Sequence, residues 1–145
     1  MIIRKTTIKD AEAITGLSDQ LGYKATAEQT WQRLFEILGH DDYCVYVAVE
    51  GDTITGWIQG FYSMRVESSD FVEISGLVVD KNHQRKGIGK LLVNEVIKWA
   101  KEKNCYNLRV RCQTFRKEAH HFYESLGFVE TKEQKVFGKV LGHKL

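Results

Sequence analysis

Proline is absent from this chain of 145 residues, and cysteine occurs only three times. No proline-rich tract, repeat or shift in composition marks a linker, so we expect a single domain over residues 1–145. The cysteines, Cys44, Cys105 and Cys112, are odd in number and lack metal-ligand spacing. We therefore expect no metal site, and free thiols in a reducing cytoplasm.

Long hydrophobic runs and a strong excess of one charge are also missing. No run is long enough to span a bilayer, and the first ten residues lack the apolar core of a secretory signal, so we expect no membrane partner. The formal net charge of +2 is too small to indicate a nucleic-acid partner by itself. Positive charge is concentrated locally, between Lys81 and Lys90.

The periodicity of apolar residues predicts a mixed α/β fold, in which a mostly antiparallel central sheet is flanked by helices. Capping-box spacing after Thr7 and after Thr26 predicts the start of two helices, with Gly22 and Gly39 at their ends. A long amphipathic helix before Asn104 links two strands, which makes them neighbours in a right-handed parallel crossover. The expected strands are residues 2–5, 43–49, 53–64, 71–79, 106–112, 128–131 and 135–141, and the last helix is 116–126.

The loop between the strand at 71–79 and the long helix carries two glycines, Gly87 and Gly89. Glycine lets the backbone approach a ligand closely, and the helix N-terminus directs unpaired N–H groups and a partial positive charge to the same place. Arg85, Lys86 and Lys90 add full positive charges. This strand–loop–helix arrangement suits a diphosphate.

Two common nucleotide motifs do not fit this loop. A Walker loop requires Ser or Thr after Gly89-Lys90, where Leu91 stands. A dinucleotide fingerprint requires a third glycine at Leu92. What remains is the pattern Gln84-x-x-Gly-x-Gly between a strand and a helix.

The segment GLVVDKNHQRKGIGKLL, together with AHHFYESLGF at residues 119–128, resembles the two diagnostic motifs of the GNAT-type N-acetyltransferases. The resemblance covers nearly the whole chain and implies that acetyl-coenzyme A is the co-substrate. One departure is Arg116, where many members carry an Asn that reaches the pantetheine arm. The residues implied to bind the co-substrate are Leu77, Val78, Val79, Gln84, Arg85, Lys86, Gly87, Ile88, Gly89 and Lys90.

Gly76 predicts a bulge that separates its strand from the strand at 106–112. Such a gap would leave the backbone of residues 77–79 free, and the resemblance implies that the pantetheine adds there like a further strand. The Leu77 N–H could then face the thioester oxygen.

Acetyl transfer to an amine needs a neutral amine and a proton for the departing thiolate. The resemblance places Tyr123 beside the cofactor sulfur, so we predict Tyr123 as the general acid; the alternative is a tyrosine that packs its helix. Glu73 is the candidate base, through a water molecule, and an exposed surface carboxylate is an equal alternative.

We therefore predict an acetyl-coenzyme A-dependent N-acetyltransferase, with a non-catalytic coenzyme A-binding or regulatory module on the same fold as the alternative. A helix-turn-helix DNA binder ranks third, because the helix after Thr26 has no basic face. The acceptor is expected to be a small amine-bearing molecule, with a protein amine as the rival, and a homodimer is considered. Side chains that could face the acceptor are Trp31, Phe35, Asp41, Asp42 and Tyr62.

Overall fold

The computed structural model describes residues 1–144. The chain forms two compact units, Met1–Arg111 and Cys112–Leu145, and each is described by itself. The single domain over 1–145 stays a prediction. None of the described helices is long and apolar enough to cross a membrane.

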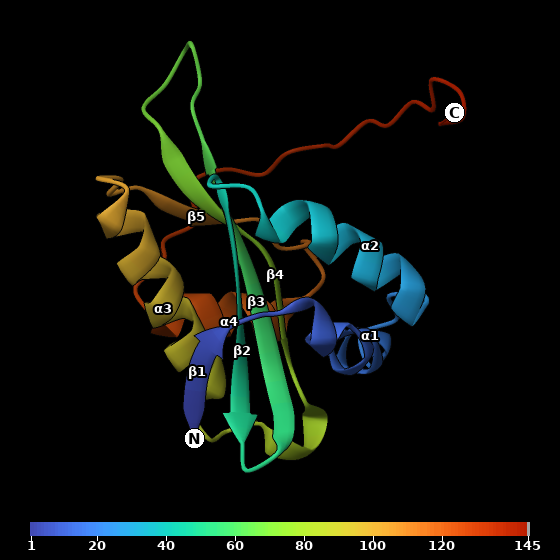
Figure 1. The fold of residues 1–145 in the computed structure, drawn as a ribbon. Helices are drawn as coiled ribbons and strands as arrows, with labels where there is room; N and C mark the ends of the chain where they lie inside the picture. The colour runs from blue at the N-terminus through green and yellow to red at the C-terminus, as the bar shows by residue number, and fades with distance from the viewer. Residues whose placement is uncertain (145) are drawn as a thin grey trace. The chain divides into compact units, whose positions relative to one another are not determined.

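The first unit is built on a five-stranded sheet with the strand order β1-β2-β3-β4-β5 (Figure 1). Neighbouring strands are antiparallel from β1 to β4, whereas β5 runs parallel to β4. This confirms the predicted mixed, mostly antiparallel sheet. The strands are β1 (Ile2–Lys5), β2 (Tyr43–Glu50), β3 (Thr53–Ser63), β4 (Phe71–Val79) and β5 (Leu108–Val110).

Three α-helices of this unit cover the two faces of the sheet (Figure 1). A 3-10 turn, Ile8–Asp10, leads into α1 (Ala11–Asp19), and α2 (Ala27–Leu38) begins at the predicted cap, where the Thr26 hydroxyl accepts a hydrogen bond from the Gln29 N–H. Helices α1 and α2 pack on one face, around Ile14, Leu34 and Val47. On the other face lies α3 (Ile88–Glu102).

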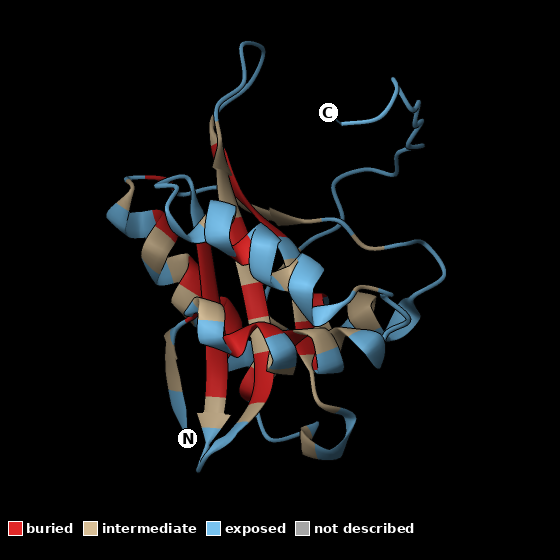
Figure 2. Cartoon of the chain, turned by 45° about the vertical axis from the view of Figure 1, so that its right-hand side comes forward, coloured by how far each residue is buried: buried red, intermediate tan, exposed pale blue. Residues whose placement is uncertain are grey.

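Helix α3 approaches the sheet closely because β3 has glycines beneath it. A Cβ added to Gly56 would come within 3.2 Å of Ile88 and Leu92, and one added to Gly60 within 3.1 Å of Val96. The core between helix and sheet is fully buried, whereas the hairpin tip after β3 is exposed (Figure 2). The two glycines therefore fix how closely the helix seats against β3.

Asp10 fastens the first strand to the first helix. Both of its carboxylate oxygens accept hydrogen bonds from Arg4 of β1, at 2.8 and 2.9 Å, and Oδ2 also accepts the Thr7 N–H. These hydrogen bonds from the guanidinium hold the pKa of Asp10 below its usual value. Both oxygens of the buried carboxylate are thus hydrogen-bonded.

The second unit contains one helix, α4 (Lys117–Ser125), after which Gly127 adopts the predicted left-handed conformation with φ 91°. The prediction of strands at 128–131 and 135–141 is wrong, because residues 128–144 contain no helix or strand. After Phe128, which is half-buried, the apolar side chains of this segment are almost fully exposed (Figure 2). A strand is stabilised by a hydrogen-bonded neighbour and by burial of one face, and this segment has neither.

Candidate functional site

Strand β4 separates from β5 halfway along its length. The parallel pairing joins only Val72, Glu73 and Ile74 to Leu108, Arg109 and Val110. The register between β3 and β4 shifts at the next residues, since Gly60 faces Ile74 and Gln59 faces Gly76. Ser75 is therefore the bulged residue beside Gly76, as the sequence predicted. Strand β5 is consequently shorter than expected, since β4 turns away from it.

The second half of β4 keeps β3 on one side and has no pairing with β5 on the other. Leu77, Val78 and Val79 pair with Ile58, Trp57 and Gly56 of β3. Successive N–H groups of a strand point to opposite neighbours, and the Asp80 N–H donates to the Thr55 carbonyl of β3 at 2.8 Å. Leu77 and Val79 therefore direct their N–H and C=O groups toward the open side.

A glycine is required at position 76, where β4 separates from β5. A Cβ at Gly76 would lie 2.6 Å from Cη2 of Trp57. The indole of Trp57 is held in this position by its Nε1–H, which donates to the Ser18 hydroxyl of α1 at 3.1 Å. The bulge is thus covered by an aromatic ring anchored to the α1 side of the sheet.

The loop after β4 ends in a helix N-terminus without a side-chain cap. Gly87 occupies the N-cap position of α3 with φ 77°, in the left-handed region that favours glycine. Because glycine has no side chain, the N–H groups of the first turn stay available to an anion. Arg85 also has a positive φ, of 66°, which is uncommon for a residue with a Cβ.

The side chains of the loop divide into buried and exposed groups. Ile88, the first residue of α3, is fully buried against β3, so only its backbone can reach a ligand. Arg85, Lys86 and Lys90 are exposed, and Lys86 lies 3.9 Å from Glu50 at the end of β2. Gln84 is exposed as well. The exposed cations leave the loop strongly positive.

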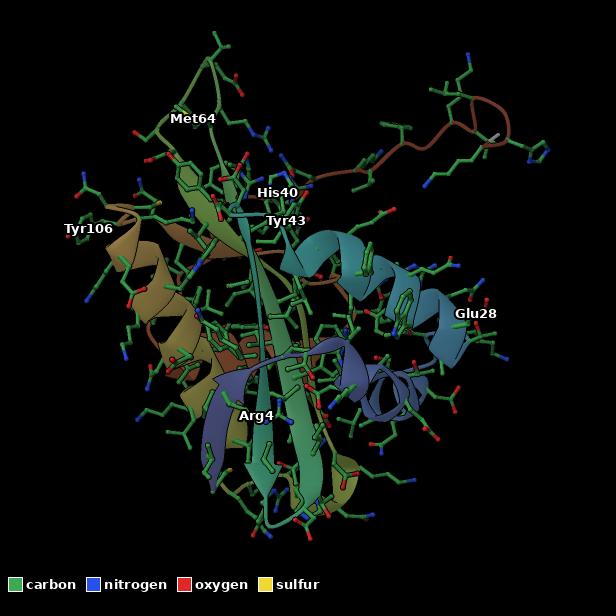
Figure 3. The ribbon with its side chains drawn as sticks, in the orientation of Figure 1. Arg4, Glu28, His40, Tyr43, Met64 and Tyr106 are labelled. Atoms are coloured by element: carbon green, nitrogen blue, oxygen red, sulfur yellow. The ribbon has the colours of Figure 1, made fainter. Side chains whose placement is uncertain are left out.

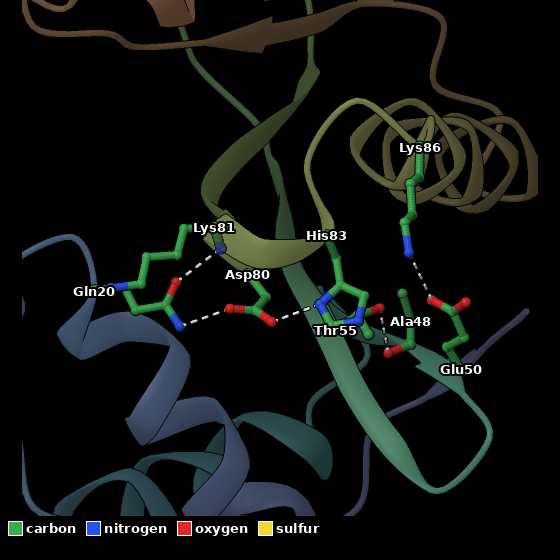
Figure 4. Close-up of polar contacts among 8 residues, drawn as sticks. All are labelled: Gln20, Ala48, Glu50, Thr55, Asp80, Lys81, His83 and Lys86. Carbon is green, nitrogen blue, oxygen red and sulfur yellow. Dashed lines mark hydrogen bonds and ion pairs between the residues drawn. The ribbon is translucent and has the colours of Figure 1, made fainter.

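Gln20, the residue after α1, connects that helix to the start of the loop (Figure 4). Its Nε2 donates to Oδ1 of Asp80 at 2.8 Å, and its Oε1 accepts the Lys81 N–H at 3.0 Å. Asp80 Oδ2 lies 2.6 Å from Nδ1 of His83. These two hydrogen-bonded partners lower the pKa of Asp80. The loop is thereby tied to the helix on the opposite side of the strand end.

Glu73 is buried, with 8% of its surface exposed, and lies in an ionic cluster on β4 and β5. Its Oε1 accepts the Nε–H of Arg109 at 2.7 Å and that of Arg111 at 3.2 Å. Oε2 receives no hydrogen bond from residues 1–144. The expectation of an exposed surface carboxylate is therefore wrong, whereas the role of Glu73 as a base stays a prediction.

Tyr123 belongs to α4 in the second unit. Its ring packs edge-on against Phe122 and Phe128, with centroids 5.0 and 5.3 Å apart. Burial raises the pKa of the Tyr123 phenol above its usual value. The phenol is consequently protonated throughout the neutral range, as a proton donor must be.

The acceptor candidates do not form one group. Trp31 and Phe35 stack on the exposed side of α2, with centroids 5.4 Å apart. Tyr62 instead donates its hydroxyl to Asp70 and lies near Lys103, which follows α3, and Asp42 also pairs with Lys103, at 3.9 Å. Figure 3 shows His40 and Tyr43 side by side at the start of β2, where their rings meet edge-on. Trp31, Phe35, Asp41 and Asp42 are exposed, whereas Tyr62 is half-buried.

These features define a class of site: a strand with one open edge, followed by a glycine-capped helix N-terminus among exposed cations. The fold matches that of an aminoglycoside 6'-N-acetyltransferase from Acinetobacter haemolyticus, with a TM-score of 0.86 and 19% identity over 98% of this chain and 100% of that chain. At this identity the similarity shows the fold alone.

Similarity of sequence defines the family. The model of the acetyltransferase (GNAT) family matches residues 12–128, and this chain belongs to that family. Family membership confirms the predicted enzyme class, an acyl-coenzyme A-dependent N-acetyltransferase, and acetyl-coenzyme A as its co-substrate.

Two curated relatives match different lengths of the chain. An aminoglycoside N(6')-acetyltransferase of Stenotrophomonas maltophilia is 27% identical over 143 residues, which cover 93% of this chain and 90% of the relative. Streptothricin acetyltransferase A of Bacillus subtilis (strain 168) is 30% identical over 70 residues, which cover 48% of this chain and 40% of that relative.

Sequence reasoning identified the loop but missed two groups of residues. Arg109 and Arg111 were visible as the polar alternation of a strand, yet their contact with Glu73 depends on the register between β4 and β5. The hydrogen bond from Gln20 to Asp80 joins residues 60 positions apart, so no local sequence pattern predicts it.

Proposed function

We propose that this protein transfers the acetyl group of acetyl-coenzyme A to the primary amine of a small molecule. The observation that carries the proposal is the open edge of β4 directly before the Gly87 loop. Support for a small acceptor comes from the relatives, two of which are named as aminoglycoside N(6')-acetyltransferases.

The residues present fit the co-substrate in two places. The first-turn N–H groups of α3 and the side chains of Arg85, Lys86 and Lys90 would hold the diphosphate, together with the backbone of Gly87 and Gly89. The open N–H and C=O groups of Leu77 and Val79 would pair with the amide-bearing arm. Acetyl-coenzyme A, when bound, supplies an activated acetyl thioester.

Side chains of the protein would then accept the proton of the amine and donate a proton to the sulfur. An amine with a pKa near that of lysine is almost entirely charged at neutral pH, so it must lose a proton before its nitrogen can attack the acetyl carbon. Oε2 of Glu73 is the carboxylate oxygen free to accept that proton through a water molecule. The new N–C bond replaces the C–S bond, and the sulfur leaves with a proton for which Tyr123 is the proposed donor.

Release of free thiol tests the proposal. The protein is mixed with acetyl-coenzyme A and a panel of amines, and thiol formation is followed together with the mass of the acceptor. We expect acceptor-dependent thiol release and a gain of one acetyl group on an amine nitrogen. Binding of acetyl-coenzyme A without any turnover across the panel would instead support a non-catalytic module.

We further propose that the protein acts in the cytoplasm, since Cys44, Cys105 and Cys112 are free thiols. The homodimer stays a prediction, which the mass in solution would test.

A further inference from the structure

Three guanidinium groups gather on β5, directly after it and in the β3–β4 hairpin. We name them the arginine cluster: Arg65, Arg109 and Arg111. Two of them flank one buried ring, since Arg109 lies 3.7 Å and Arg65 5.1 Å from the centroid of Phe71. Arg109 and Arg111 share the single oxygen Oε1 of Glu73. Contacts from three separate segments thus hold the cluster together.

The charges of the cluster do not balance. Three guanidinium groups stand against the one carboxylate of Glu73. Asp70 accepts a hydrogen bond from the Tyr62 hydroxyl. Tyr62 pairs with Val72 and therefore lies on the other face of the sheet, so Asp70 is not a partner of the cluster. The cluster is therefore left with excess positive charge in a chain whose formal net charge is only +2.

The cluster also has unused hydrogen-bond donors. A guanidinium carries five N–H donors, and each bond to Glu73 uses only one of them. Nη2 of Arg109 is buried and has no hydrogen-bond partner in the part of the chain that the structure describes. The side chain of Arg111 is 51% exposed, so its remaining donors face solvent. A planar fork of donors of this kind matches a carboxylate or a phosphate.

The location of the cluster links it to the acceptor. Glu73 pairs with Phe61, which lies four residues from Trp57 on β3 and hence on the same face, the face covered by α1. The open part of β4 begins at Leu77, within about 13 Å of Glu73 at the usual rise of about 3.3 Å per residue. The cluster and the open edge are therefore neighbours on one strand.

We infer that the acceptor is an amine that also carries an anionic group, a carboxylate or a phosphate, and that Arg111 and Arg109 bind this group. The inference rests on the proposed function, because it names the substrate class of the same site. A polycation such as an aminoglycoside would meet like charge here, which is an effective means of excluding it. The acceptor class thus differs from the one in the names of the relatives.

Matched acceptors test the inference in two ways. Calorimetry on the protein without co-substrate compares γ-aminobutyrate with butylamine and putrescine, and phosphoethanolamine with ethanolamine; neamine represents the polycations. Turnover with acetyl-coenzyme A is measured on the same set. We expect the anionic member of at least one pair to bind about tenfold more tightly and to have a correspondingly lower KM. The two pairs distinguish a carboxylate from a phosphate.

Variants connect the preference to the cluster. Arg111→Gln is expected to reduce the preference for the anionic acceptor about tenfold, while acetyl-coenzyme A binds as before. Arg111→Lys should restore part of this preference. Lys98→Gln, on α3 at the opposite face, makes the same change of charge and should leave the preference intact. Thermal unfolding confirms that each variant is folded.

The outcomes separate this inference from the proposed function. Anionic preference in binding without any acetyl transfer would support the cluster and overturn the proposed activity. Acetyl transfer that favours putrescine or neamine over the anionic amines, or a preference unchanged in Arg111→Gln, would overturn the inference and leave the activity standing.

Discussion

The two halves of β4 differ in what lies beside them. Residues 72–74 pair with β5, and two guanidinium groups contact Glu73 there. Residues 77–79 have β3 on one side and an open edge on the other, and lead into the uncapped N-terminus of α3. One bulge at Ser75 separates a completed part of the sheet from an incomplete part.

The difference shows how one strand can serve two ligands. Completed pairing positions side chains precisely enough for an ionic cluster, whereas incomplete pairing leaves backbone donors and acceptors available. If the proposed function holds, the half with the open edge binds the co-substrate, and the half paired with β5, the closed half, binds the acceptor. Changes in either half should therefore affect one ligand and spare the other.

Gly87→Asp should produce the largest effect, and only on the open half. The carboxylate would repel a diphosphate by up to about 4 kcal/mol at about 4 Å, so we expect acetyl-coenzyme A affinity to fall between about a hundredfold and a thousandfold. Titration calorimetry measures it. Gly22→Asp is the matched control, since Gly22 has a φ of 85° and open space around it. Equal affinity in both folded variants would refute the role of the loop.

Tyr123→Phe tests whether a proton donor outside both halves takes part. The ring keeps its packing against Phe122 and Phe128 while the hydroxyl is lost. We expect kcat to fall about a hundredfold, with kcat/KM falling equally and acetyl-coenzyme A affinity unchanged. A folded variant with the wild-type kcat, under conditions where chemistry limits the rate, would make Tyr123 a packing residue.

Glu73→Gln probes the closed half. The amide oxygen can still accept the Nε–H of Arg109, so the sheet should persist while the basic carboxylate is removed. Steady-state kinetics should show kcat reduced by about a hundredfold and unchanged binding of acetyl-coenzyme A. Glu67→Gln, in the exposed hairpin tip, serves as the control. Wild-type turnover in Glu73→Gln would leave Glu73 with a structural role only.

Gly76→Ala acts at the junction of the two halves. The added methyl group meets the Trp57 ring at 2.6 Å, so the ring must move and its bond to Ser18 is strained. We expect a loss of about 1–3 kcal/mol in the free energy of unfolding, measured in urea and reported by tryptophan fluorescence. Gly16→Ala in α1 meets no atom within 4 Å and should instead stabilise the protein by about 0.5–1 kcal/mol.

Added salt should have the smallest effect. Arg85, Lys86 and Lys90 are exposed, so their attraction for the diphosphate is screened by ions. Acetyl-coenzyme A affinity should fall by about threefold to tenfold when the ionic strength rises from about 0.05 M to about 0.5 M. An affinity that does not change over this range would mean that the backbone alone holds the diphosphate.

Local requirements explain why much of this site could be predicted from the sequence. Thr26 and Gln29 predicted a cap because the two residues that form it are only three positions apart. Gly87 predicted a close approach of the backbone to a ligand at a helix N-terminus, and the structure places Gly87 at the N-cap of α3 with a positive φ. Gly76 predicted the bulge, and Trp57 supplies the steric reason for a glycine at this position.

The sequence by itself determined the family, the order of the elements as far as α4, and the loop after β4, because caps, glycines and apolar periodicity act over a few residues. Only the tertiary structure decided that Glu73 is held by Arg109 and Arg111, that Gln20 bridges to Asp80, and that residues 128–144 form no strand. These features depend on which strands pair and where the pairing stops. That is settled by register and burial between distant segments, and an alternating pattern without a partner is not enough to make a strand.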